Sequence, residues 1–292
     1  MKTSAKTDRV MQDITKAVAD AISNGTAPWQ KPWESRFDAD WPVNLTTGRQ
    51  YSGFNAIALH MFGGASFDGC PYWAGYKQWQ AHGAPGEVKI VAPATWILRP
   101  RLITERDADG IKRQKCIGFS PCKVFNAKQV TGITIPEQDR TPRILDAGKL
   151  DAWTVAVGAD IKIGGDQACY IPKLDIVKMP ERDAFKTPGG YYGTLLHELT
   201  HWTGHASRLD RHKKRSSRSY AFEELIAELG CYYSSEKLGC PNECENHASY
   251  IDSWLKALDS DTKYLYDAAS QAQKASQLLL NLGKRIAEAE AA

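Results

Sequence analysis

The sequence His197-Glu-Leu-Thr-His201 constrains this chain more than any other segment. Side chains four residues apart lie on the same face of an α-helix, so both histidines can reach one metal ion only if this segment is helical. Glu198 lies between them and can reach a water molecule at that ion. The nearby positions are uncharged, as a helix buried behind a metal site requires: Thr194, Leu195, Leu196, Leu199, Thr200 and Trp202. The segment therefore predicts a buried, metal-binding helix.

The spacing His-Glu-x-x-His is typical of zinc peptidases, in which the glutamate is the general base and the metal lowers the pKa of the attacking water. A catalytic zinc needs three protein ligands and one open position. Glu224 and Glu228 lie four residues apart on the next predicted helix, a pattern that resembles thermolysin-like (gluzincin) sites. We therefore predict Glu198 as the catalytic base, Glu224 as the third ligand and Glu228 as a residue that orients a ligating histidine. The expected cofactor is Zn²⁺, with Mn²⁺ as the alternative.

Two other residues compete for the third ligand position. His205 lies eight residues after His197, which is about 12 Å along one helix, too far for both rings to reach one ion. We expect His205 near the cleft instead, as a hydrogen-bond donor. Glu223 would shift the helix face by about 100° and place Ala227 where Glu228 is needed. Glu224 is therefore preferred.

The bulk properties set the broad class. A chain of 292 residues predicts about two domains. It has no run of 18 apolar residues and no signal-peptide pattern at its N-terminus, so we expect a cytoplasmic protein without a membrane partner. The seven cysteines are odd in number and lack the spacing of a disulfide framework, which indicates a reduced environment.

The basic charge is concentrated in the first half. Residues 1–145 carry 19 Lys and Arg against 13 Asp and Glu, whereas residues 146–292 carry 18 against 21. Six of the nine tryptophans lie in the first hundred residues, at positions 29, 33, 41, 73, 79 and 96. Aromatic faces for base stacking together with cations for phosphates are what single-strand DNA binding requires. The alternative is that these aromatic side chains belong to the core.

Periodicity and turn residues give an approximate order of elements. The first half has three predicted helices, at 8–24, 51–62 and 76–82, and two predicted strands, at 88–103 and 117–126 with a charged hairpin between them. The second half has a helix and a strand within 147–163, strands at 168–171 and 175–179, and four helices at 191–205, 220–238, 248–259 and 262–290. Two prolines and dense charge at 133–150 predict a linker between domains 1–132 and 151–292.

Several segments in this order resemble one family, the ArdC-type antirestriction proteins of plasmids. In the first half they are 24–33 (NGTAPWQKPW), 42–55, Tyr76-Lys-Gln-Trp79 and 124–130. In the second half they are 170–175, 191–205 (YYGTLLHELTHWTGH) and 220–229. The resemblance covers most of the chain. A related N-terminal domain occurs in TraC-type plasmid primases.

The resemblance implies an α+β fold of two domains, an N-terminal single-stranded DNA-binding domain and a zincin-like metallopeptidase domain with a mostly helical C-terminus. It implies a role in conjugation, in which the protein protects incoming DNA from host restriction and cuts an unidentified protein, such as a restriction or DNA-bound protein. The matching positions for DNA are Trp29, Lys31, Trp33, Arg49, Tyr51, Lys77 and Trp79. The alternative function is a non-catalytic protein that coats single-stranded DNA and has a structural or vestigial metal site.

Overall fold

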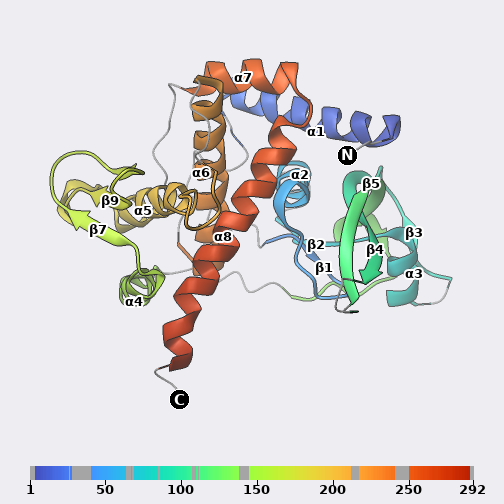
Figure 1. The fold of residues 1–292 in the computed structure, drawn as a ribbon. Helices are drawn as coiled ribbons and strands as arrows, with labels where there is room; N and C mark the ends of the chain where they lie inside the picture. Colours follow the sequence, from blue (N-terminus) through green and yellow to red (C-terminus); the bar gives the residue numbers. More distant parts are fainter. Residues whose placement is uncertain are drawn as a thin grey trace. The chain divides into compact units, whose positions relative to one another are not determined.

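The computed structural model describes residues 4–25, 27, 41–63, 67, 69–84, 86–106, 110, 112–137, 145–211, 217–240 and 250–289, with only the backbone at 217–219 and 285–289. The chain divides into two compact units, which are described separately (Figure 1). The first comprises Met1–Val18 and Arg36–Arg140, and the second comprises Ala19–Ser35 and Thr141–Ala292. Both helices and sheets are present, which agrees with the predicted α+β fold.

The first unit contains most of helix α1 (Ala5–Ser23), whose buried stripe has the helical spacing expected from the sequence: Val10, Met11, Ile14, Val18 and Ile22. Its described residues also form α2 (Gly53–Gly63), α3 (Tyr76–His82), a 3₁₀ turn η1 (Ala127–Gln129) and six strands. The strands are β1 (Val43–Asn44), β2 (Tyr72–Ala74), β3 (Lys89–Ile90), β4 (Thr95–Arg106), β5 (Lys112–Asn126) and β6 (Val130–Thr131).

The main sheet of this unit has the order β1-β2-β5-β4, and β3 pairs with β6 in a second sheet. Side chains alternate between the faces of a strand. Trp73 of β2 therefore packs in a cluster with Leu59 of α2, whereas the next residue, Ala74, packs in a cluster with Trp79 of α3. The side-chain amide of Asn55, in α2, accepts a hydrogen bond from the Leu98 N–H at 2.9 Å and donates one to the Leu98 carbonyl oxygen at 2.8 Å. These two bonds satisfy the backbone of β4 at Leu98 as a neighbouring strand would.

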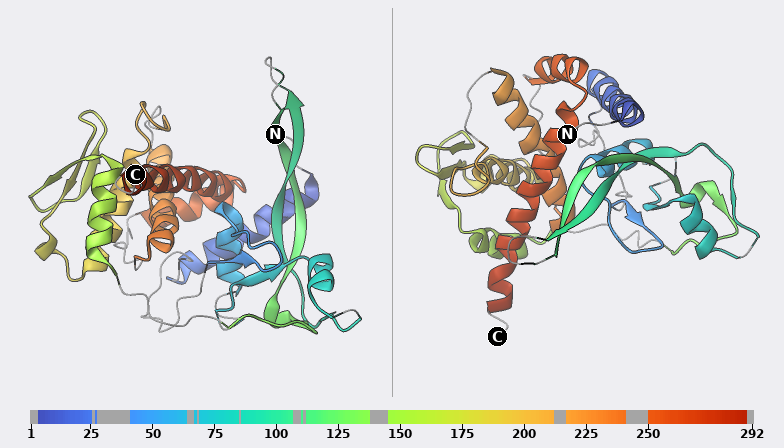
Figure 2. Two further views of the ribbon diagram at one scale, coloured as in Figure 1. Left: turned by 90° about the horizontal axis from the view of Figure 1, so that it is seen from below. Right: turned by 45° about the vertical axis from the view of Figure 1, so that its right-hand side comes forward.

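The predicted strand at 88–103 is two strands, because the backbone leaves the sheet between Ile90 and Thr95, where Pro93 cannot donate a ladder hydrogen bond. The second predicted strand begins earlier, at Lys112, and pairs with β4 from Lys112 to Val124, whereas Phe125 and Asn126 pair with β2. β4 and β5 are antiparallel, and most of the charged connection expected between them lies outside the described residues. β4 and β5 extend beyond the other elements of the unit as a two-stranded ribbon (Figure 2).

The second unit contains a small sheet of order β7-β9-β8, in which β7 is parallel and β8 antiparallel to β9. Its elements are α4 (Ala147–Val157), β7 (Asp160–Ile163), β8 (Cys169–Ile171), β9 (Ile176–Met179), a 3₁₀ turn η2 (Arg182–Ala184), α5 (Pro188–Trp202), α6 (Ser217–Leu238), α7 (Ile251–Ser260) and α8 (Tyr264–Ala289). Helix α5 contacts β8 and β9 on one side and α6 and α8 elsewhere. Its apolar residues form the core with side chains from α4 and β9. No helix among the described residues is long and apolar enough to span a membrane.

Candidate metal centre

The metal-motif segment forms α5, with two boundary corrections. The helix was predicted to begin at Tyr191, but Pro188, Gly189 and Gly190 form its first turn. The Thr187 side chain caps this turn by accepting from the backbone N–H of Gly190 at 3.0 Å, and proline is well tolerated at the first helical position because no helical partner exists there for an N–H. The helix ends at Trp202 rather than at His205.

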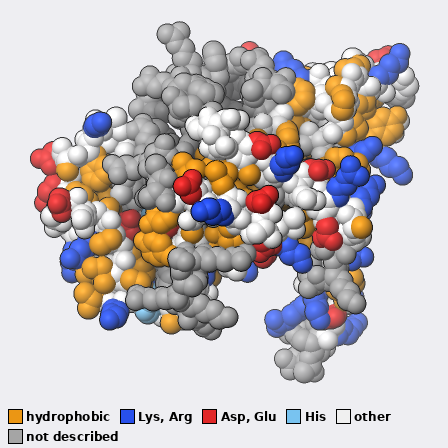
Figure 3. Space-filling model, turned by 90° about the horizontal axis from the view of Figure 1, so that it is seen from above, with side chains coloured by type: hydrophobic (Ala, Val, Ile, Leu, Met, Phe, Trp, Pro, Cys, Tyr) orange, Lys and Arg blue, Asp and Glu red, His pale blue; other side chains and the backbone are white. Residues whose placement is uncertain are grey.

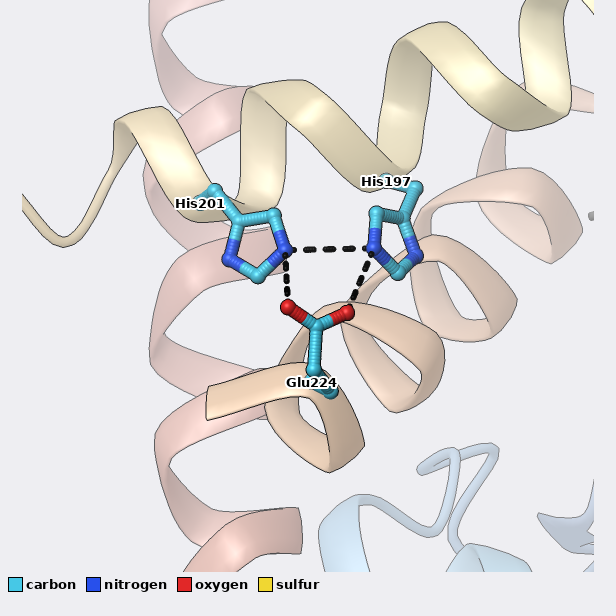
Figure 4. Close-up of side chains that lie close together, drawn as sticks. All are labelled: His197, His201 and Glu224. Atoms are coloured by element: carbon cyan, nitrogen blue, oxygen red, sulfur yellow. Dashed lines mark hydrogen bonds and ion pairs between the residues drawn. The ribbon is translucent and has the colours of Figure 1, made fainter. Parts of the chain in front are cut away.

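Helices α5 and α6 bring the three predicted ligands, His197, His201 and Glu224, close together (Figure 4). The two histidine Nε2 atoms lie 3.1 Å apart. Each Nε2 lies 3.5 Å from a different carboxylate oxygen of Glu224. His197 and Glu224 are buried, and His201 is nearly so. Three potential ligand atoms therefore converge on one point.

These distances fit a bound divalent metal. Ligand atoms about 2.1 Å from one ion and arranged tetrahedrally lie about 3.4 Å from one another. The observed separations of 3.1, 3.5 and 3.5 Å match that value closely. Two imidazoles and one carboxylate form a His₂Glu donor set, which is found at catalytic zinc sites. The residues present therefore suit the expected metal.

Glu198 lies beside this triad, against the neighbouring sheet. The backbone N–H of Tyr170, in strand β8, donates to Glu198 Oε2 at 2.7 Å. β8 uses its other edge to pair with β9, so this N–H points away from the sheet and toward α5. The contact fixes the orientation of a carboxylate that is only 8% exposed. Strand β8 thus supports the residue predicted as general base.

Two acidic residues of α6 lie behind the histidines. Glu228 is buried, and its Oε1 lies 3.9 Å from Nδ1 of His197, beyond hydrogen-bond range but on the predicted side of the ring. Glu223, which helical spacing argued against, lies 3.4 Å from Nδ1 of His201. Arg211 donates to both carboxylate oxygens of Glu223, at 2.8 and 3.2 Å. A carboxylate on the second ring nitrogen is the usual way that proteins orient a ligating histidine.

Arg211 also ties this carboxylate to the end of α5. Its guanidinium donates to the carbonyl oxygen of Thr200 and to Oγ1 of Thr203, both at 2.8 Å. The sequence gives no signal for this role, because Arg211 lies outside the predicted helices. Its guanidinium connects the loop after α5 to α6.

The site carries an excess of negative charge. Burial lowers the pKa of His201, but hydrogen bonds to Glu223 and Glu224 outweigh burial and raise the pKa to about 10. Burial raises the pKa of Glu223, whereas hydrogen bonds from His201 and Arg211 outweigh it and lower the pKa to about 2. A histidine that retains its proton so strongly indicates a site whose electrostatics favour an added cation.

His205 lies in the turn after α5 and not in the ligand cluster. Its Nδ1 lies 2.8 Å from Oγ of Ser207 and 3.9 Å from Oδ2 of Asp175. Arg208 donates to both carboxylate oxygens of Asp175, and its guanidinium stacks 3.7 Å from the centre of the Trp202 ring. Asp175 has φ of 55°, a backbone conformation uncommon outside glycine, which these contacts hold in place. The group connects the β8–β9 turn to the end of α5.

The structure describes some of the predicted DNA contacts. Trp29, Lys31 and Trp33 lie outside the described residues. The prediction for Trp79 is wrong, because this side chain is fully buried and its indole N–H donates to the carbonyl oxygen of Phe125 at 3.1 Å. Tyr51 is half-buried against the α2 cluster, where burial raises the pKa of its hydroxyl to about 12. Trp79 cannot stack on a base, and Tyr51 has a structural role.

The other two positions are exposed and belong to segments that meet. Asn44 donates to the Tyr51 hydroxyl at 3.3 Å and to Oε1 of Gln78 at 3.2 Å, which joins the loop bearing Arg49 to the first turn of α3. Arg49 and Lys77 are both exposed. Tyr76, which the sequence did not single out, is 46% exposed at the start of α3. The exposed aromatic ring of this motif is therefore Tyr76, three residues before Trp79.

Known proteins resemble both halves of the chain. Residues 8–114 match the family model of the N-terminal domain of anti-restriction factor ArdC, and residues 148–271 match a model of zincin-like metallopeptidases. DNA primase TraC of Escherichia coli is 34% identical over 92% of this chain, which spans only 27% of that relative's length. The uncharacterized protein y4eC of Sinorhizobium fredii (strain NBRC 101917 / NGR234) is 32% identical, over 91% of this chain and 89% of its own.

Two solved structures share the fold over nearly their whole length. The metal-free crystal structure of the antirestriction protein ArdC from plasmid R388 has a TM-score of 0.77 at 33% identity and covers 94% of this chain and 97% of its own. The Mn(II)-bound structure of the same protein has a TM-score of 0.75 at 33% identity, and the match covers 94% of this chain and 98% of that protein's chain. The full-length agreement in sequence and structure shows that this chain belongs to the ArdC family of antirestriction proteins.

Proposed function

We propose that the second unit is a metal-dependent peptidase and that the first unit binds single-stranded DNA, so that peptide cleavage occurs on or near that DNA during protection from restriction. The convergence of His197, His201 and Glu224 within 4.8 Å, with Glu198 beside them, carries the peptidase proposal. The Mn(II)-bound structure of a relative supports the binding of a divalent ion. Zn²⁺ is the ion that this donor set favours.

A divalent metal in this site would polarise a peptide carbonyl and acidify water. The chain supplies the remaining groups. Glu198 would take the proton of the attacking water and then pass it to the leaving amine, and the Tyr170 N–H holds its carboxylate for this role. Because Tyr170 of β8 contacts Glu198, a peptide extended alongside β8 would bring its backbone next to this carboxylate. Arg208 links the β8–β9 turn to the end of α5, because it pairs with Asp175 and donates to the carbonyl oxygen of Trp202 at 2.8 Å.

The decisive experiment compares Glu198→Gln with His197→Ala. Glu198→Gln should bind metal normally but lose cleavage of a peptide library and lose protection of a transferred plasmid in a restricting host. His197→Ala should lose metal binding as well. If Glu198→Gln protects the plasmid like the wild type, then cleavage is not the basis of protection. The metal site would then be structural or vestigial, in a protein that coats DNA.

Single-strand binding rests on Tyr76, Lys77 and Arg49, which are exposed and lie on segments that Asn44 joins. Stacking of one base on an aromatic ring contributes about 1–3 kcal/mol, so Tyr76→Ala should weaken binding to an oligonucleotide by about 5- to 150-fold. Tyr76→Phe keeps the ring and should bind normally. Equal binding by all three proteins would remove Tyr76 from the DNA site.

A further inference from the structure

The β4–β5 ribbon has solvent on both faces over much of its length. The described side chains at 99–106 and 112–117 are all exposed. They include three large apolar residues, Leu102, Ile103 and Ile117, of which Leu102 is 53% exposed. A two-stranded ribbon without a covered face is only marginally stable in water. A ribbon of this kind is therefore better explained by a binding partner than by the stability of the fold.

The ribbon is strongly basic. From residue 99 to residue 123, the described residues include seven Lys and Arg and one acid, Glu105. The space-filling view shows Lys and Arg gathered on the end of the ribbon, which projects at the lower right (Figure 3). Arg106 lies directly opposite Lys112 in the β4–β5 register. Like charges in this position destabilise a strand pair, although Arg106 also donates to the carbonyl oxygen of Gly110 at 3.2 Å. A polyanion would relieve their repulsion.

The cations occupy both faces. Arg99 and Arg101 are two residues apart on β4 and therefore share one face. The register shift after Arg101 leaves an extra residue on β5 and does not interrupt the alternation of β4. Arg106, five residues after Arg101, therefore points to the opposite face, together with Lys112. Gly118 leaves room for the Arg101 side chain, since a Cβ there would lie 2.8 Å from a guanidinium nitrogen.

We propose that the β4–β5 ribbon lies in a groove of double-helical nucleic acid. The major groove of DNA admits a two-stranded β-ribbon and has phosphates along both of its walls, which matches cations on both faces. A single strand bound along the ribbon would need cations on one face only. The connecting residues include Asp107 and Asp109 in the sequence, so the phosphate contacts fall on the strands and not on the turn. This surface shares no residue with the Tyr76 segment or the metal centre, and it would let the protein hold the duplex that flanks a single strand.

The test uses the full-length protein with a blunt duplex of about 20 base pairs and a single strand of the same sequence, both fluorescently labelled, between about 50 and 200 mM salt. One variant combines Arg99→Gln with Arg101→Gln, and a second combines Arg106→Gln with Lys112→Gln. The control combines Arg9→Gln with Lys16→Gln, two exposed cations of α1, and so removes the same charge. Thermal unfolding checks that all three variants are folded.

Each lost phosphate contact lowers the salt slope by about 0.9 and the affinity at about 0.1 M salt by about eightfold. Both ribbon variants should therefore weaken duplex binding by about 10- to 100-fold and reduce the slope by about 2, and the control should match the wild type. The proposal fails if only one of the two faces affects duplex binding, or if the ribbon variants bind the duplex like the control. Failure of the single-strand proposal would appear instead in the Tyr76→Ala variant with the single strand, so the two proposals are tested separately.

Discussion

A close contact between the two metal-binding helices gives a quantitative prediction. Gly230 of α6 faces Thr200 of α5, and a Cβ added to Gly230 would lie 2.8 Å from Thr200 Oγ1 and closer still to Cγ2. Thr200 is fully buried, and its hydroxyl donates to the carbonyl oxygen of Leu196 at 2.8 Å, so the side chain cannot easily rotate away. Gly230→Ala therefore has to separate the helices by about 1 Å, because nonbonded carbons need about 3.5 Å.

Overpacking of this kind lowers the free energy of unfolding by about 1–3 kcal/mol. Because Thr200 cannot easily move, we expect a loss near the upper value of about 3 kcal/mol. The better helix propensity of alanine returns about 1 kcal/mol, which leaves a net loss of about 2 kcal/mol. The Tm of this unit should fall by about 4–8 °C in calorimetry. The separation also moves Glu224 away from the histidines, so affinity for Zn²⁺ or Mn²⁺ should fall at least about tenfold in titration calorimetry.

Two variants make this prediction refutable. Gly148→Ala, in α4, introduces a Cβ whose nearest contact is an ordinary 3.6 Å, so it should leave the Tm unchanged or raise it slightly. Thr200→Ala combined with Gly230→Ala removes the atoms that collide, and the double variant should be more stable than the sum of the two single changes predicts. If Gly230→Ala has the same Tm as Gly148→Ala and binds metal normally, then the contact between Gly230 and Thr200 is not close enough to exclude a Cβ.

The other contacts lead to three further predictions. Glu223→Gln removes the charge beside His201 and should lower metal affinity about 10- to 100-fold in titration calorimetry; unchanged affinity would exclude an orienting role. Trp79→Ala should destabilise the first unit by about 3–5 kcal/mol in urea unfolding, and a neutral effect would show that the ring is not a core residue. The pKa of Asp175 lies below its usual value, mainly because Arg208 donates hydrogen bonds to its carboxylate. Because the folded pKa is the lower one, this contribution is complete above pH about 4 and disappears as pH falls through the folded pKa. Asp175→Asn should therefore be less stable than the wild type at neutral pH, by about 1 kcal/mol or less for a partly exposed pair, with equal stabilities at low pH. A difference that persists in acid would contradict this assignment.

Some of the site follows from helical spacing alone. His197 and His201 share a helix face at any position in a protein, and Glu224 and Glu228 share another. The pairing of these two faces was predicted from the resemblance to thermolysin-like sites. The position of Glu223 cannot, because one residue step turns a helix by about 100° and suggests that Glu223 points away. The structure shows that α6 runs close enough to α5 for Glu224 to meet Nε2 of His201 while Glu223 reaches its Nδ1.

The first unit shows the opposite balance between what the sequence and the structure reveal. Tyr76 and Trp79 lie three residues apart in one motif, and composition treats their aromatic rings as equivalent. Burial separates them, because Trp79 faces β5 and the interior cluster whereas Tyr76 faces solvent. The charge excess at 89–128 is visible in the sequence, but its distribution over two faces of a ribbon depends on the β4–β5 register.

The sequence by itself predicted the features with a local period, namely a helix with two histidines on one face and a second helix with two carboxylates on one face, and its motifs indicated a two-domain family. Only the tertiary structure decided which side chains are exposed, which carboxylate orients His201, and that the Tyr170 N–H holds Glu198. The physical reason is the range of the contacts. A helix repeats every 3.6 residues and so can be derived from neighbours in sequence. The contact from Tyr170 to Glu198 joins residues 28 positions apart, and the path of the chain between them sets its geometry.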